Sequence, residues 1–183
     1  SERNLALFVL LYKDLLHGRY ADFAQDLKHL PDSPPTEPLG YGLGYQRQPG
    51  PSLELFHWLG DQTPSGYVCP GIAQTAATLQ TERSNAHALN CLGEFILRNR
   101  LDAMPLDQRR DAETLGGSAP GFAGESFSRM DGYRQVIANP KAGRDEKAYA
   151  LFRALYCYAP AGYNSCGGQE AEPATRKAWF RQL

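Results

Sequence analysis

The sequence predicts an all-α fold, an irregular and repeat-like stack of helical hairpins with long loops rich in Gly and Pro. Apolar residues recur at helical spacing in most segments, Pro and Gly stand where these segments end, and Val and Ile are scarce. Strands are enriched in β-branched residues and alternate apolar with polar positions, and neither feature is evident here. We therefore expect one all-α domain over residues 1–183.

The first predicted hairpin covers the N-terminal part of the chain. Leu5–Leu16 is apolar at almost every position, which predicts a helix buried around most of its circumference, and Gly18 ends it. Tyr20–Leu30 again carries apolar residues at helical spacing and ends at Pro31. Residues 32–51, rich in Pro and Gly, have neither helical nor strand periodicity, so we expect a long loop there.

A second hairpin is predicted after a short helix. The short helix covers Leu53–Leu59, with Ser52 as a possible N-cap and Gly60 at its end. Pro70 suits the first turn of the next helix, and Asn85 suits the N-cap of the one that follows.

The third hairpin follows a second long loop or linker over residues 102–121. Its first helix begins near Phe127 and ends around Asn139, and its second helix starts at Asp145. A last helix opens at Pro173.

Two sets of residues match the spacing that is typical of one repeat family, namely Gly18, Tyr20 and Pro35 in the first hairpin and Ala148, Phe152, Leu155 and Pro160 in the third. In these positions the chain resembles tetratricopeptide-type repeats. The resemblance implies repeated helical hairpins. The first helices lack the Trp and Gly of that family, and Leu155 is larger than its usual Ala.

The cysteines bear on the compartment. Their spacing shows no CxxC and no nearby pair of histidines, so we expect no structural zinc and no other metal. Cys157 lies near the end of a predicted helix, and Cys166 follows in a loop that can fold back and close a short bridge. Bridged cysteines would indicate a periplasmic or extracellular protein, whereas four reduced cysteines, including Cys69 and Cys91, would indicate the cytoplasm.

Charge and hydropathy exclude two classes of partner. Nineteen Lys and Arg against twenty Asp and Glu leave no positive surplus for nucleic acid. The longest apolar run, Leu5–Tyr12, is far shorter than the roughly 20 residues of a membrane span. The chain begins at Ser1 without an initiator Met, and the apolar stripe of Trp179, Phe180 and Leu183 stops abruptly, so we expect a fragment of a larger protein.

Two motifs invite a catalytic interpretation. The pair Glu125-Ser126 resembles the catalytic Glu-Ser of lytic transglycosylases, in which the Glu is general acid and base, but the later Gly-Leu-Met-Gln type motif is missing. Residues 40–44 are rich in glycine, yet they lack the flanking strand and helix of a dinucleotide site, so we expect no cofactor.

The leading prediction is a non-catalytic domain that binds a protein partner or other domains of its parent protein, or acts as a scaffold, in the cell envelope. Candidate contact residues are aromatic: Tyr41, Tyr45, Tyr158, Tyr163 and Trp179. The alternative for these aromatic residues is that they pack the hairpins together. Two other functions stay open, an envelope glycan-cleaving enzyme with Glu125 as its acid and base and a purely structural spacer.

Overall fold

The computed structural model describes residues 2–39, 50–63, 66–102, 104, 106, 122 and 124–183. The α-helices in these ranges are α1 (Glu2–Leu16), α2 (Tyr20–Asp26), α3 (Ile72–Thr81), α4 (Ala86–Asn99), α5 (Arg129–Ala138), α6 (Arg144–Tyr156) and α7 (Pro173–Gln182). The short elements are the 3-10 helices η1 (Leu27–His29) and η3 (Leu53–His57) and the strands β1 (Gly60–Gln62) and β2 (Val68–Pro70). The predicted helical character is confirmed.

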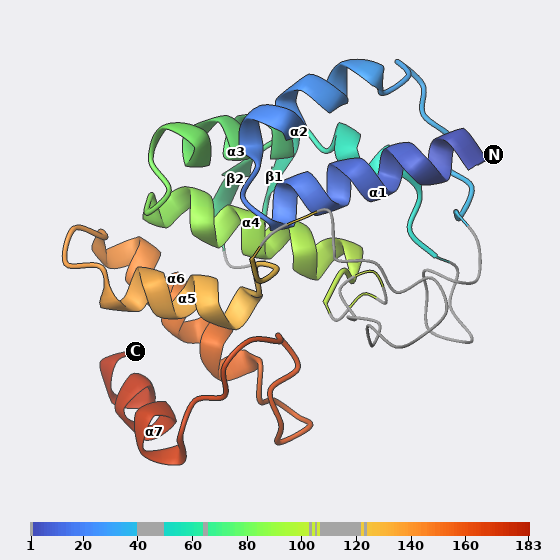
Figure 1. Cartoon of the computed structure of the whole chain (residues 1–183). Helices are drawn as coiled ribbons and strands as arrows, with labels where there is room; N and C mark the ends of the chain where they lie inside the picture. Colours follow the sequence, from blue (N-terminus) through green and yellow to red (C-terminus); the bar gives the residue numbers. More distant parts are fainter. Residues whose placement is uncertain are drawn as a thin grey trace.

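Helices that are consecutive in the sequence also lie side by side (Figure 1). Each helix from α1 to α7 contacts the next one, and α4 also contacts α6 and β2. In Figure 1, α5 and α6 lie between α7 and the group formed by α1 to α4. Helix α4 therefore occupies the middle of the structure, which explains why its residues Ala88–Ile96 are all buried.

The turn between α1 and α2 forms where Gly18 was predicted to break the helix. Gly18 has φ 68°, a left-handed conformation that favours glycine, and its carbonyl accepts a hydrogen bond of 2.9 Å from Arg83 Nη2. Helix α2 ends at Asp26 and the 3-10 helix η1 follows directly. The single helix predicted up to Leu30 is therefore an α-helix followed by one 3-10 turn.

A cluster of phenylalanines joins the N-terminal helices to α4. The ring of Phe56, from η3, lies 5.5 Å from Phe8, 6.0 Å from Phe23 and 6.0 Å from Phe95 between centroids. The short helix predicted over 53–59 is therefore present as a 3-10 helix that inserts an aromatic anchor into the core. The side chain of Ser52 makes no capping hydrogen bond, in contrast to the prediction.

The structure corrects the expectation that strands are missing. Strands β1 and β2 pair antiparallel, with Gly60 opposite Pro70 and Gln62 opposite Val68. Strands of three residues are too short to show an alternating pattern in the sequence. Pro70 accordingly lies in β2 instead of the first turn of α3, and Gly71 is the N-cap of that helix.

Several predicted helix boundaries are confirmed by their caps. The Asn85 side chain accepts a hydrogen bond of 3.0 Å from the backbone N–H of Ala88 at the start of α4. Pro173 occupies the first turn of α7. Helix α5 begins at Arg129, with Ser128 as its N-cap, slightly later than the predicted start near Phe127.

The four cysteines form two disulfide bridges. Cys157 and Cys166 are bonded, as the sequence suggested, and Cys69 is bonded to Cys91, which ties β2 to α4. The two Cα–Cα distances are 5.5 and 5.4 Å, and all four residues are buried. In the folded structure all four cysteines are thus paired.

The predicted long loops are described in part. Residues 32–39 and 50–51 contain no helix or strand, in agreement with the prediction for 32–51, whereas residues 40–49 lie outside the described ranges. Of the loop predicted over 102–121, residues 102, 104 and 106 alone are described. Within the part of the chain that is described, no helix is long and apolar enough to cross a bilayer.

Candidate functional site

The C-terminal half of α6 and the loop after it expose three aromatic side chains. Phe152 is 38% exposed, Tyr156 58% and Tyr163 64%. Phe152 and Tyr156 are one helical turn apart, and their ring centroids lie 5.6 Å from each other. We call Phe152, Tyr156 and Tyr163 the aromatic surface.

Two residues of the aromatic surface, Tyr156 and Tyr163, lie in a part of the sequence that carries no charge, whereas Phe152 lies just before it, with the Arg153 guanidinium 5.7 Å from the centre of its ring. Between Arg153 and Glu170 there is no Lys, Arg, Asp or Glu. Residues 159–163 in the middle of this stretch are all exposed. An exposed segment of a water-soluble surface normally contains charged residues, and charged residues are depleted at the centres of protein interfaces. The composition of this stretch is therefore that of a contact surface.

Local hydrogen bonds and a disulfide shape the loop that carries Tyr163. The Cys157–Cys166 bridge closes the loop, and the carbonyl of Cys157 accepts hydrogen bonds from the backbone N–H of Ser165 at 2.9 Å and from its hydroxyl at 2.8 Å. Inside the loop, the backbone N–H of Gly162 donates to the carbonyl of Tyr158 at 2.8 Å. Tyr163 is thus presented by a constrained segment.

Two other predicted contact residues lie inside the fold. Tyr158 is 8% exposed and Trp179 6% exposed, and both belong to the hydrophobic core. The Tyr158 hydroxyl accepts a hydrogen bond of 2.7 Å from the backbone N–H of Ala171, and the Arg176 guanidinium lies 4.2 Å from the centre of its ring. These contacts are those of the packing alternative, and they attach α7 to the end of α6. Tyr41 and Tyr45 lie outside the described residues.

A buried polar network connects α4 to α6, the helix that carries Phe152 and Tyr156. Glu94 is 4% exposed and accepts hydrogen bonds from the Tyr149 hydroxyl and, at 2.9 Å, from Arg153 Nη2. Arg153 Nε also donates to the Tyr149 hydroxyl at 3.0 Å. Burial and the neighbouring Glu94 carboxylate raise the pKa of Tyr149, so this hydroxyl remains a donor at neutral pH.

The network continues toward the Cys69–Cys91 disulfide through Tyr67. The Tyr67 ring stacks on Tyr149 with centroids 4.0 Å apart, and its hydroxyl lies 3.0 Å from His87 Nδ1. Asn90 Nδ2 donates to the Tyr67 hydroxyl at 3.1 Å and to the carbonyl of Glu146 at 3.0 Å. Burial raises the pKa of Tyr67 to about 12. Because Glu94 and Asn90 are buried and out of reach of a ligand, we interpret the network as a structural link that holds α6 against α4.

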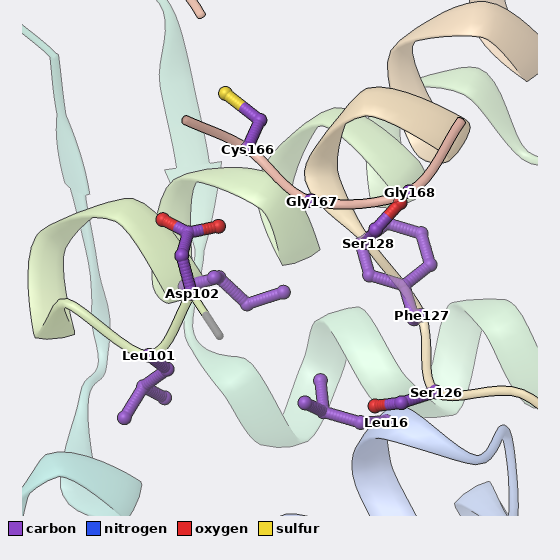
Figure 2. A pocket seen from close by; sticks show the side chains of 10 residues that line it. Leu16, Leu101, Asp102, Ser126, Phe127, Ser128, Cys166, Gly167 and Gly168 are labelled. Carbon is purple, nitrogen blue, oxygen red and sulfur yellow. The ribbon is translucent and has the colours of Figure 1, made fainter. Parts of the chain in front are cut away.

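A cavity of about 150 Å³ lies where the ends of α1 and α4, the segment before α5 and the loop of residues 166–168 meet (Figure 2). Its apolar wall consists of Leu16 at the end of α1, Ile96 and Leu101 around the end of α4, and Phe127. The polar wall includes Ser126 and the carboxylate of Asp102.

The residue proposed as a general acid and base does not lie in this cavity. Glu125 is exposed and precedes Ser126, which does line the cavity. A general acid of the lytic transglycosylase type is buried, so the surroundings of Glu125 give its catalytic role no support, and that role stays an untested prediction. In the described part of the chain, no three His, Cys, Asp or Glu side chains group as metal ligands would.

Sequence reasoning missed Phe152 and Tyr156 as candidate contact residues. It assigned them to the same helix as the core residues Leu151 and Ala154 and did not separate the exposed side of this helix from the buried side. Their spacing of four residues was the available signal, because it puts both rings on one stripe of α6.

Comparison with protein-family models, with curated proteins and with solved structures finds no match to this chain.

Proposed function

We propose that this chain is a non-catalytic helical domain that binds another protein, or another domain of its parent protein, through the aromatic surface. The observation that carries the proposal is the exposure of Tyr156 and Tyr163 along a stretch without charged residues, with the exposed Phe152 one helical turn before Tyr156. Tyrosines are enriched among the residues that contribute most to protein binding. The occupant that fits an uncharged aromatic surface is an apolar, uncharged segment of the partner.

The contacts that hold α6 and its loop in place also favour binding. Phe152 and Tyr156 extend from a helix that the ion pair of Glu94 and Arg153 attaches to α4, and Tyr163 belongs to a loop closed by a disulfide. Side chains that are already ordered lose little conformational entropy when a partner binds, so more of the contact energy contributes to affinity.

A peptide selection with matched variants tests this function. A phage-displayed peptide library is selected on the folded wild-type chain, and the affinity of the enriched peptides is measured by calorimetry. We expect peptides rich in apolar residues, and we expect Tyr156→Ala and Tyr163→Ala to weaken their binding about 10- to 30-fold. Because the contact is uncharged, the affinity should change little between low and high salt.

Leu59→Ser is the matched control, because Leu59 is also a large exposed apolar residue, at 91%, and lies outside the aromatic surface. This variant should bind the peptides like the wild type. Peptides that bind all variants equally, or a selection that enriches only charged peptides, would remove the support for this function.

We also propose an oxidising location, the periplasm or the outside of the cell. Support comes from the two buried disulfides, because reducing conditions in the cytoplasm disfavour such bonds. The test is the intact mass of protein isolated from its own host and alkylated at once, before and after reduction. Alkylation of four thiols before reduction would place the protein in the cytoplasm.

The likeness to tetratricopeptide-type repeats stays a proposal about architecture. The contacts of α1 with α2, α3 with α4, and α5 with α6 support three successive hairpins. A repeat array predicts that its hairpins superpose on each other, and an experimental structure compared hairpin by hairpin tests this. Hairpins with unrelated crossing angles would contradict the repeat.

A further inference from the structure

Helix α7 exposes apolar side chains that do not belong to the aromatic surface. Phe180 is 72% exposed, more than any other aromatic side chain in the part of the chain that the structure describes, and Leu183 is 58% exposed. The helix packs against α6 and buries Trp179. Successive residues of an α-helix point about 100° apart, so Phe180 turns away from the core that its neighbour Trp179 enters.

Two cations flank Phe180 on the exposed side of the helix. Lys177 lies one helical turn before Phe180, Arg181 follows it directly, and both are exposed. Neither of the two side chains has an ion-pair or hydrogen-bond partner among the residues that the structure describes. We call Lys177, Phe180, Arg181 and Leu183 the α7 face.

The charges of the surrounding residues leave the α7 face positive. From Pro173 to Leu183 the sequence contains no Asp or Glu. The third cation of the helix, Arg176, lies with its guanidinium 4.2 Å from the centre of the Tyr158 ring and so belongs to the side that packs on the fold. Glu172 precedes the helix and lies about 13 Å from the level of Arg181 along the axis, which exceeds the Debye length of about 8 Å at physiological ionic strength.

The stability of the helix explains only part of this arrangement. A cation in the last turn interacts favourably with the partial negative charge at the C-terminal end of a helix, which accounts for Arg181. The same effect gives no reason for Lys177 in the middle of the helix or for the exposure of Phe180. An exposed aromatic ring between two cations that lack counter-charges is instead the composition of a contact with an anionic, partly apolar surface.

We propose that the α7 face binds the surface of an anionic lipid bilayer. Lys177 and Arg181 would contact the headgroup phosphates, and Phe180 would enter the layer between the headgroups and the acyl chains. The shape of the face favours a bilayer over a protein partner, because the exposed side of a single helix is convex. A fluid bilayer adapts to a convex surface, whereas a protein partner needs a groove that fits the helix. In Figure 1, α5 and α6 separate α7 from α1 to α4, so the bilayer would lie at the opposite end of the molecule from these helices.

Sedimentation with lipid vesicles tests this proposal on the full chain. Vesicles of phosphatidylcholine alone are compared with vesicles that also contain about 30% phosphatidylglycerol, and the partition coefficient is measured at low and at high salt. We expect the wild type to bind the anionic vesicles at least about 10-fold more strongly, and we expect salt to weaken this binding because it screens exposed charges. This comparison needs no variant.

Variants of the α7 face separate the contributions of charge and of apolar contact. The double variant Lys177→Gln with Arg181→Gln should lower the partition coefficient about 10- to 30-fold, since each cation near an anionic surface contributes a factor of about five. Phe180→Ser should lower it about 5- to 10-fold. The double variant Lys141→Gln with Arg144→Gln is the matched control, because it removes the same charge from exposed positions outside α7, and it should bind like the wild type.

Three results would overturn the proposal. The first is equal partition of the wild type into both kinds of vesicle, and the second is an equal loss in the control variant and in the α7 double variant. The third is binding of a poly-glutamate peptide without binding of anionic vesicles, which would make the α7 face a docking site for an acidic protein. Tyr163→Ala should bind vesicles like the wild type, so the outcome is independent of the aromatic surface.

Discussion

Asp14 makes the stability of the fold depend on pH in a direction opposite to that of most carboxylates. The residue lies on α1, is 2% exposed, and has Arg19 Nε 3.5 Å from its Oδ1 atom. Burial is the main cause that raises its pKa from 3.8 to about 6, a hydrogen bond with the Asp26 side chain adds to this, and Arg19 opposes it. Compared with the unfolded chain, the folded chain therefore favours the protonated, neutral form of Asp14.

The sign of the effect follows from proton linkage. A carboxyl group whose pKa is higher in the folded than in the unfolded chain contributes most stability at low pH, and this is lost as the pH rises from about 4 to above 6. Each pKa unit corresponds to about 1.4 kcal/mol, which sets an upper value of about 3 kcal/mol. The opposing charge of Arg19 is half exposed and screened by water, so it offsets only part of this cost, and we expect about 1.5–3 kcal/mol.

The substitution Asp14→Asn tests this reasoning, because Asn has the shape of the neutral acid at every pH. We expect the free energy of unfolding of Asp14→Asn to exceed that of the wild type by about 1.5–3 kcal/mol at pH 7.5 and to match it at pH 4. Urea unfolding followed by circular dichroism at constant ionic strength measures both values. Asp32→Asn, at an exposed position, is the control and should follow the wild type. A variant that is less stable than the wild type at pH 7.5 would refute the role of burial.

Two further predictions concern the Glu94–Arg153 ion pair of α6 and the disulfide that closes the following loop. Glu94→Gln leaves the Arg153 guanidinium buried without its counter-charge and should lower the free energy of unfolding, measured with urea, by about 3–5 kcal/mol. The double variant with Arg153→Met should recover part of the lost stability. A loss below about 1 kcal/mol in Glu94→Gln would contradict the role of the network. Replacing both Cys157 and Cys166 by Ser should lower the melting temperature by about 5–10 °C, because the unfolded chain gains freedom; an unchanged calorimetric melting curve would show that the bridge adds nothing.

Helix boundaries could be predicted from the sequence where a single residue acts locally. Asn85 caps α4, Pro173 begins α7 and Gly18 ends the first helical segment, and each of these effects involves only neighbouring residues. The bridge of Cys157 with Cys166 belongs to the same class, because a short loop brings both residues together. Local chemistry was sufficient for these features.

Features that depend on distant partners were not predicted. Strands β1 and β2 exist because they pair with each other and because Cys91 of α4 binds Cys69. Asn90 and Glu94 are polar residues that the sequence alone places in water, and their burial depends on Tyr67, Tyr149 and Arg153, which are far away in the sequence.

The candidate site was predicted in part for the same reason. Tyr163 is exposed as expected, since a polar loop surrounds it, but Tyr158 contacts the segment that leads into α7, and Trp179, on α7 itself, is buried in the core. The spacing within α6 places Phe152 and Tyr156 on one stripe, but the contacts of α6 with α4, α5 and α7 decide that this stripe is exposed. Tertiary contacts therefore determine which aromatic residues remain available to a partner.

The bridge between Cys157 and Cys166 has a consequence for proteolysis of the loop that carries Tyr163. Tyr163 is an exposed residue in a segment that proteases can reach, and the two bridge cysteines flank it. Cutting the backbone next to Tyr163 would add one water to the mass, yet α7 would stay covalently attached to the rest of the chain. A domain built in this way tolerates a nick in its most exposed loop until a reductant releases the C-terminal piece.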